Sequence, residues 1–66
     1  MPIINVTLAK GRTPEQLRSL IHELSTGAQR AVDAPIESVR VILHEVEPAH
    51  FAAGDVTLEE RRAAAE

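Results

Sequence analysis

Residues 13–32, TPEQLRSLIHELSTGAQRAV, decide the fold of this chain because they predict one long amphipathic helix. Thr13 offers an N-cap hydroxyl, Pro14 suits the first helical position, and Gln16 completes a capping box. Apolar side chains recur every three or four residues, at Leu17, Leu20, Ile21, Leu24, Ala28, Ala31 and Val32. We expect the helix to end at residues 33–35, DAP, because a residue before proline leaves the helical region.

Two predicted strands flank this helix. Residues 3–8, IINVTL, are rich in β-branched side chains and run into a turn at Gly11. Residues 39–46, VRVILHEV, place Val39, Val41 and Leu43 on one face and Arg40, Ile42, His44 and Val46 on the other. The helix would be roughly 28 Å long and the second strand roughly 26 Å long, so the helix can cross back over the sheet. The pattern predicts an α/β fold, a single β-α-β unit with parallel strands that oligomerisation completes.

Oligomerisation is expected because the chain has little interior of its own. A domain of 66 residues buries only about 60% of the surface that its unfolded chain exposes. The sequence has no cysteine, so neither disulfides nor thiolate metal sites can add stability. A two-stranded sheet with one helix also leaves its second face open to water, and another chain can cover that face.

The remaining residues predict a loop and a second helix start. Residues 47–55 have the composition of a loop, and Thr57 with Glu60 forms a second capping-box pattern before an alanine-rich end. This tail either frays or docks elsewhere. We expect one domain over residues 1–66, with a core at 2–54 and a tail at 55–66.

Composition excludes several classes of function. The net charge is −3 and Phe51 is the only aromatic residue, which argues against nucleic-acid binding. No apolar run approaches the length of a membrane span and no signal peptide is recognisable, so a cytoplasmic protein is expected, with no membrane partner. His22, His44 and His50 show no metal-ligand spacing, so no metal site is expected.

Three residues are candidates for chemistry. Pro2 follows Met1, and a small second residue permits removal of the initiator methionine, which would leave a secondary amine. Desolvation and nearby arginines lower the pKa of an amine towards neutrality, where it can act as a general base. Arg12, at the strand-to-helix turn, and Arg40, in an otherwise apolar strand, are suited to bidentate carboxylate binding. Taken singly, each of the three is more commonly explained without chemistry, by a chance Met-Pro start or by a solvated surface or interchain salt bridge, so only their combination argues for a site.

Together these features resemble 4-oxalocrotonate tautomerase. The resemblance is carried in order by Pro2-Ile3, Gly11-Arg12, Glu15-Gln16, Asp33-Ala34-Pro35, residues 38–42 and His50-Phe51, and it spans residues 2 to about 54 without gaps. It implies an isomerase of aromatic catabolism that moves a proton between an enol or dienol and its conjugated ketone without a cofactor. The implied substrate is a small unsaturated 2-oxo or 2-hydroxy acid such as 2-hydroxymuconate.

The resemblance also implies roles for particular residues in a homohexamer, a trimer of dimers. Pro2 would be the catalytic base, Arg40 would bind one carboxylate and polarise the adjacent oxygen, Arg12 would hold the far carboxylate, and Phe51 would line the pocket. Extended residues 2–9 separate Arg12 from Pro2 of the same chain by more than about 20 Å. A neighbouring chain must therefore supply Arg12, and an antiparallel dimer across the first strands would do so.

The sequence departs from the family pattern in two places. Ala9 stands where relatives usually have a larger aliphatic residue, and residues 52–55, AAGD, replace a glycine-richer segment, so the sequence does not identify the substrate.

Two alternative functions remain. One alternative is a hydratase or dehalogenase of an unsaturated acid with Pro2 protonated as general acid. The other is a non-catalytic subunit of a hetero-oligomer.

Overall fold

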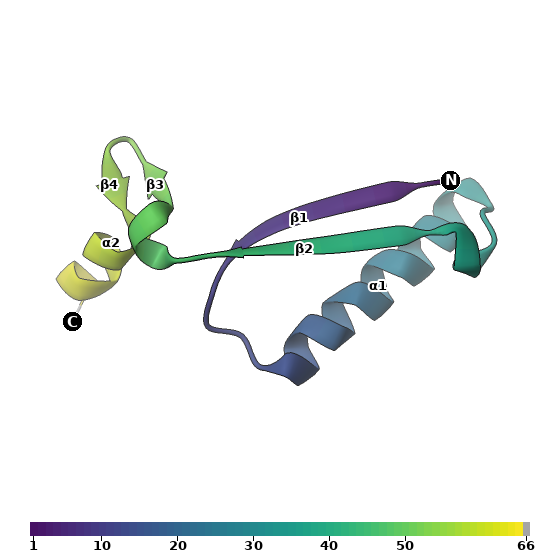
Figure 1. The fold of residues 1–66 in the computed structure, drawn as a ribbon, viewed down its shortest axis with the longest axis horizontal. Coiled ribbons are helices and arrows are strands. Elements are labelled where there is room, and N and C mark those ends of the chain that lie inside the picture. Colours follow the sequence, from purple (N-terminus) through teal and green to yellow (C-terminus); the bar gives the residue numbers. More distant parts are fainter. Residues whose placement is uncertain (66) are drawn as a thin grey trace.

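The predicted β-α-β unit is present. The computed structural model describes residues 1–65. Strand β1 (Ile3–Ala9) leads to helix α1 (Pro14–Val32), a single 3-10 turn η1 (Ile36–Ser38) and strand β2 (Arg40–Val46) (Figure 1). The two strands pair in parallel, with Ile3 beside Arg40 and Ala9 beside Val46. This confirms the α/β prediction with parallel strands.

The strand bounds differ slightly from those predicted. β1 continues one residue further, to Ala9. β2 starts at Arg40 instead of Val39, because the Val39 N–H donates to the Ile36 carbonyl at 3.2 Å and so closes the preceding turn.

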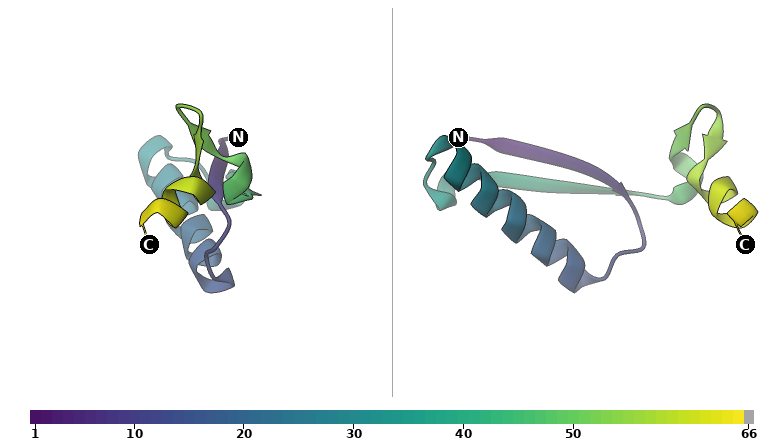
Figure 2. Two further views of the ribbon diagram at one scale, coloured as in Figure 1. Left: turned by 90° about the vertical axis from the view of Figure 1, so that its left-hand side faces the viewer. Right: turned by 180° about the vertical axis from the view of Figure 1, so that it is seen from behind.

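Helix α1 has the bounds that the sequence predicted. Gln16 N–H donates to Thr13 Oγ1 at 3.1 Å, and Thr13 N–H donates to Gln16 Oε1 at 3.0 Å, so the capping box is complete. The helix covers one face of the sheet (Figure 2), where the side chains of Ile4, Val6 and Leu8 are partly buried. Val32, the last residue of the apolar stripe, is 63% exposed in the protomer.

Residues 47–55 are more ordered than the loop that we expected. A second 3-10 turn, η2 (Pro48–His50), is followed by a hairpin of β3 (Ala52–Ala53) and β4 (Val56–Thr57). The hairpin turns through Gly54 (φ 61°) and Asp55 (φ 64°), and two left-handed residues are what a tight two-residue turn requires. Pro48 has the fixed φ that suits the first position of a helical turn.

Helix α2 (Leu58–Ala65) completes the chain, and it begins at the second predicted capping box. Glu60 N–H donates to Thr57 Oγ1 at 3.1 Å, and Thr57 N–H donates to Glu60 Oε1 at 2.8 Å. Arg61 Nη2 also donates to the Ala53 carbonyl at 3.2 Å, which fastens α2 to the hairpin. We call residues 48–65, which comprise η2, the hairpin and α2, the C-terminal arm.

The C-terminal arm stands away from the β-α-β unit. It packs mainly on itself and continues from the end of β2 (Figures 1 and 2). The radius of gyration is 15.1 Å, whereas a compact domain of this length has a radius of about 11 Å. The shape is therefore far more extended than that of a self-contained small domain.

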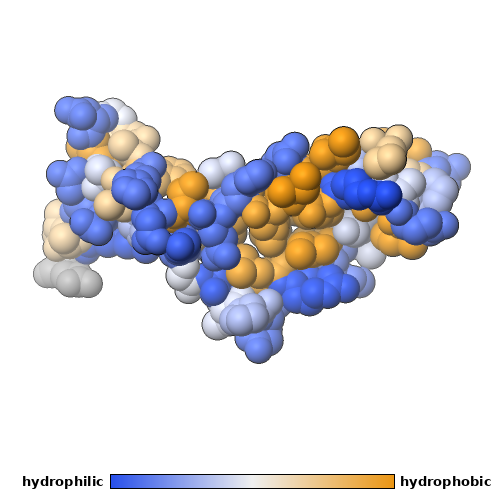
Figure 3. Space-filling view, in the orientation of Figure 1, coloured by the Kyte–Doolittle hydropathy of each residue, from blue (hydrophilic) through white to orange (hydrophobic). Residues whose placement is uncertain are grey.

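Burial within the protomer is minimal. Among residues 1–65 only Ala9 is buried, at 6% exposure. The sheet face opposite α1, which we call the open face, carries exposed side chains from both strands: Ile3, Asn5, Thr7, Arg40, Ile42 and His44. Apolar surface gathers over the β-α-β unit, whereas the arm is largely hydrophilic on the side shown in Figure 3. None of the helices in the described residues is long and apolar enough to cross a membrane.

Candidate active site

Pro2 and Arg40 lie at the same end of the sheet. The Arg40 N–H donates to the Pro2 carbonyl at 2.9 Å, so the start of β2 is fixed against the residue that precedes β1. The Arg40 guanidinium is exposed on the open face and its Nη1 donates to the Glu37 carbonyl at 2.7 Å. The guanidinium can therefore bind a ligand beside Pro2 of its own chain. It can equally reach a ligand held by another chain that covers the open face.

Arg12 and Phe51 lie towards the opposite end. Gly11 has φ 133°, a backbone conformation that favours glycine, and it turns the chain out of β1 towards α1. Arg12 Nη1 donates to the Ala9 carbonyl at 3.2 Å. Phe51, 39% exposed, follows η2 beyond the end of β2. The seven residues of β1, roughly 23 Å when extended, lie between Pro2 and this end, so one protomer does not bring the four residues together.

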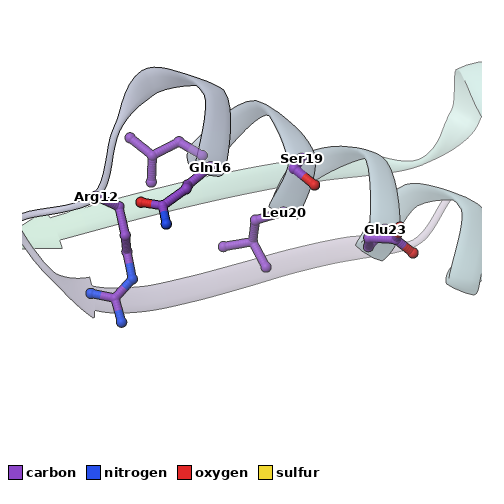
Figure 4. A pocket seen from close by; sticks show the side chains of 6 residues that line it. Arg12, Gln16, Ser19, Leu20 and Glu23 are labelled. Carbon is purple, nitrogen blue, oxygen red and sulfur yellow. The ribbon is translucent and has the colours of Figure 1, made fainter.

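A hollow of about 310 Å³ lies beside Arg12, along the first half of α1. Its lining comprises Arg12, Gln16, Leu17, Ser19, Leu20 and Glu23. Figure 4 shows Arg12 reaching past the end of β1 and Leu20 pointing from the helix towards that strand. Helix α1 packs mainly against β2, which leaves this space beside β1 for another element.

An ion pair joins the far ends of the two strands. Lys10 Nζ lies 2.7 Å from Glu47 Oε1, and both side chains are 53% exposed. The hydrogen bond and charge of Glu47 raise the pKa of Lys10 above its ordinary value. The same bond and the Lys10 charge lower the pKa of Glu47. The sequence reasoning missed this pair, although each residue directly follows a strand end and the parallel register sets them side by side.

One further polar contact lies on the open face. His44 Nε2 is 3.4 Å from Asn5 Oδ1, which links the two strands across their exposed side. Within residues 1–65 there is no group of three His, Cys, Asp or Glu side chains that could hold a metal ion.

Comparison with known proteins assigns the family. The family model described as "Tautomerase enzyme" matches residues 2–61. The chain belongs to the tautomerase family. A 2-hydroxymuconate tautomerase of Pseudomonas putida is 44% identical to this tautomerase over 54 residues, which are 82% of this chain and 86% of the relative.

Solved structures of 4-oxalocrotonate tautomerases and their homologues have the same fold as this tautomerase. A 4-oxalocrotonate tautomerase homologue of the tomaymycin biosynthetic pathway has a TM-score of 0.94 and 37% identity, over 98% of this chain and 100% of that one. A heterohexamer 4-oxalocrotonate tautomerase from Chloroflexus aurantiacus has a TM-score of 0.88 and 37% identity, over 91% of this chain and 97% of that one. The resemblance to 4-oxalocrotonate tautomerase is confirmed, and the chain is a tautomerase-like isomerase.

Proposed function

We propose that this tautomerase moves a proton between the enol or dienol form of a small unsaturated 2-oxo acid and its conjugated ketone, with Pro2 as the base after Met1 is removed. The observation that carries the proposal is the bond from the Arg40 N–H to the Pro2 carbonyl at 2.9 Å, which keeps an arginine at the amine's end of the sheet. A guanidinium near an amine disfavours its protonated form and can bind a carboxylate bidentately. The similarity to a 2-hydroxymuconate tautomerase supports the same substrate class.

The proposed reaction needs only proton transfers and charge stabilisation. The unprotonated Pro2 nitrogen takes the proton of the enol hydroxyl, and the resulting ammonium returns a proton to carbon further along the conjugated chain. Arg40 binds the carboxylate beside the reacting oxygen and stabilises the charge that develops there. Arg12 holds a second carboxylate at the far end, and Phe51 forms an apolar wall.

We further propose that the active site is composite and that residues 1–66 act as one tautomerase-like domain in a homohexamer, a trimer of dimers. Pro2 and Arg12 lie at opposite ends of β1, so antiparallel pairing of two β1 strands would set the Arg12 of each chain beside the Pro2 of the other. The hollow beside β1 has room for part of the second copy, and the exposed residues of the open face suit contact between dimers. The extended shape, with one buried residue in the described part of the chain, favours assembly over an isolated monomer.

The test is to replace the proposed base. Intact-mass spectrometry first establishes that Met1 is absent, because a retained methionine would turn the Pro2 nitrogen into an unreactive amide. Pro2→Ala keeps a terminal amine but removes the ring, and we expect turnover of 2-hydroxymuconate to fall by about 10²- to 10⁴-fold, the usual size of a general-base contribution. Pro14→Ala, the same exchange at the start of α1, is the matched control.

Three outcomes would contradict the proposal. Full activity of Pro2→Ala in an intact assembly would remove Pro2 from the mechanism. A chain that assembles only with a second, different chain, as judged by native mass spectrometry, would make it a subunit of a hetero-oligomer. If unsaturated acids are hydrated or dehalogenated faster than enols are ketonised, with activity rising as Pro2 becomes protonated, the alternative with Pro2 as acid replaces ours.

A further inference from the structure

The hydrogen-bond ladder of the sheet shows which backbone groups of β1 are unused. At one end of β1 the Pro2 carbonyl accepts from the Arg40 N–H, and at the other end the Lys10 N–H donates to the Val46 carbonyl, both at 2.9 Å. The residues of this chain segment that bond to β2 are therefore even-numbered. In a parallel ladder the bonding residues alternate along a strand. The N–H and carbonyl groups of Ile3, Asn5 and Thr7 therefore point to the free edge of β1.

This alternation restricts how two β1 strands can pair. In an antiparallel pair the bonded positions must face each other, so odd-numbered residues must lie opposite odd-numbered residues. The full overlap of Ile3–Ala9 with its symmetry copy satisfies this rule with Val6 on the twofold axis. Asn5 then faces Thr7 of the partner subunit, and Pro2 faces Lys10 of the partner subunit. A shift of two residues keeps the alternation but shortens the overlap.

The residue that faces Pro2 is held in place by its ion pair. Lys10 is fixed through its backbone to Val46 and through its ammonium to the Glu47 carboxylate, 2.7 Å away. The amine of Pro2 would therefore border two opposite charges that belong to the other chain. Other charged or titratable groups at this junction are Arg12, Glu45 and His50 on the Lys10 side, and Arg40 and Glu37 on the Pro2 side.

We propose that the Lys10–Glu47 ion pair is a positioning element of the partner subunit's active site, whose balanced charges set the pH range in which the Pro2 amine is free to accept a proton. This rests on the proposed function and on pairing through β1. The ammonium disfavours a protonated amine nearby, and the carboxylate favours it. Together they nearly cancel, so removing either one alone leaves the other unbalanced, and the two removals act in opposite directions.

The test compares four variants by the pH dependence of kcat/KM. In Lys10→Met the unpaired carboxylate should move the acidic limb of the profile to higher pH, and in Glu47→Gln the unpaired ammonium should move it to lower pH. Each shift should be about half a pH unit, as expected for a unit charge roughly 8 Å away in a largely aqueous setting. The double variant should return close to the original profile, and Lys10→Arg should preserve it.

Matched measurements separate this proposal from simpler explanations. Arg18→Gln removes a positive charge from the exposed side of α1 and should leave the limb in place. The amine can also be titrated directly by nuclear magnetic resonance with ¹⁵N-labelled proline, which does not depend on turnover. If the ion pair only fastens the strand ends, both single variants lower stability and neither moves the limb, which overturns the proposal.

The experiments distinguish failure of the proposed function from failure of the role proposed for the ion pair. If Pro2→Ala retains full activity, Pro2 is not the base and both proposals are wrong. If activity requires Pro2 but the two single variants shift the profile in the same direction or not at all, only the role of the ion pair is wrong.

Discussion

Within its own chain, the Arg12 guanidinium donates to a backbone carbonyl that the proposed dimer would use as a hydrogen-bond acceptor. Its Nη1 donates to the Ala9 carbonyl at 3.2 Å, and Ala9 is an odd-numbered residue whose carbonyl points to the free edge of β1. In the proposed pairing the Ile3 N–H of the partner subunit donates to that carbonyl. The guanidinium is then released and its fork is available for a carboxylate beside the other chain's Pro2.

The two arginines should therefore differ in their effect on substrates with one and two carboxylates. Arg12→Ala should lower kcat/KM for the dicarboxylate 2-hydroxymuconate by about 10- to 100-fold, the size of a lost charged hydrogen bond. It should affect the monocarboxylate phenylenolpyruvate much less. Arg40→Ala should impair both substrates. Equal losses on both substrates in Arg12→Ala would show that Arg12 does not hold a far carboxylate.

Glu60 predicts a pH dependence within the C-terminal arm. The Thr57 N–H and hydroxyl lower its pKa below the ordinary 4.5. Because the folded-state pKa is depressed, this cap contributes fully above pH 4.5 and is lost as the pH falls through the lowered value. The Thr57 amide resonance should report that transition, and Glu60→Gln, which keeps an acceptor without a titrating group, should abolish it. An unchanged transition in Glu60→Gln would assign it to another group.

At the scale of elements, the sequence predicted those helices and strands whose ends are marked by nearby residues, such as capping boxes and prolines. Helix α1 could be bounded correctly because Thr13, Gln16 and the residues before Pro35 carry its start and end signals. The hairpin could not, because its two-residue strands are too short to show an alternation. For the candidate site the sequence names residues but not their arrangement, because Pro2 and Arg12 lie at opposite ends of one strand. The Lys10–Glu47 contact depends on the register of β1 and β2, which the sequence does not show.

The free edge of β1 gives a prediction at this scale. Thr7→Pro removes an N–H that points away from β2, so it deletes no hydrogen bond between β1 and β2, while one donor of the proposed β1 pairing is lost. We expect the variant to form no dimers by native mass spectrometry and, because its protomer has almost no interior, to show less secondary structure by circular dichroism than the assembled protein. Thr7→Val, which keeps the N–H, is the control and should assemble normally. Normal assembly of Thr7→Pro would exclude pairing through this edge.

At the scale of the whole molecule, the exposed apolar side chains of the open face favour contact with other chains. The open face carries Ile3 at 61% exposure and Ile42 at 45%, close to polar Asn5 and His44. Apolar side chains in such a surface contribute favourably when another chain removes them from water, by about 25 cal/mol for each Å². In the proposed hexamer this face makes the contact between dimers, and β1 makes the pairing within each dimer.

A charge on the open face should separate the two levels of assembly. Ile42→Asp would bury a carboxylate between dimers, so we expect it to yield dimers in place of hexamers by analytical ultracentrifugation. Gln29→Asp adds the same charge on the exposed side of α1 and should leave the hexamer intact. Hexamers of Ile42→Asp as stable as the unmodified protein would show that the open face lies outside the contact.

Ala9 is the single buried residue among residues 1–65, and this has a consequence for a newly made chain. Until it meets its copies, such a chain has almost no interior and is exposed to proteases along its whole length. On the proposed assembly, survival depends on encounters between chains, and the rate of those encounters rises faster than the chain concentration. Halving synthesis would therefore remove more than half of the active enzyme, and the cell's supply of activity would respond steeply to expression.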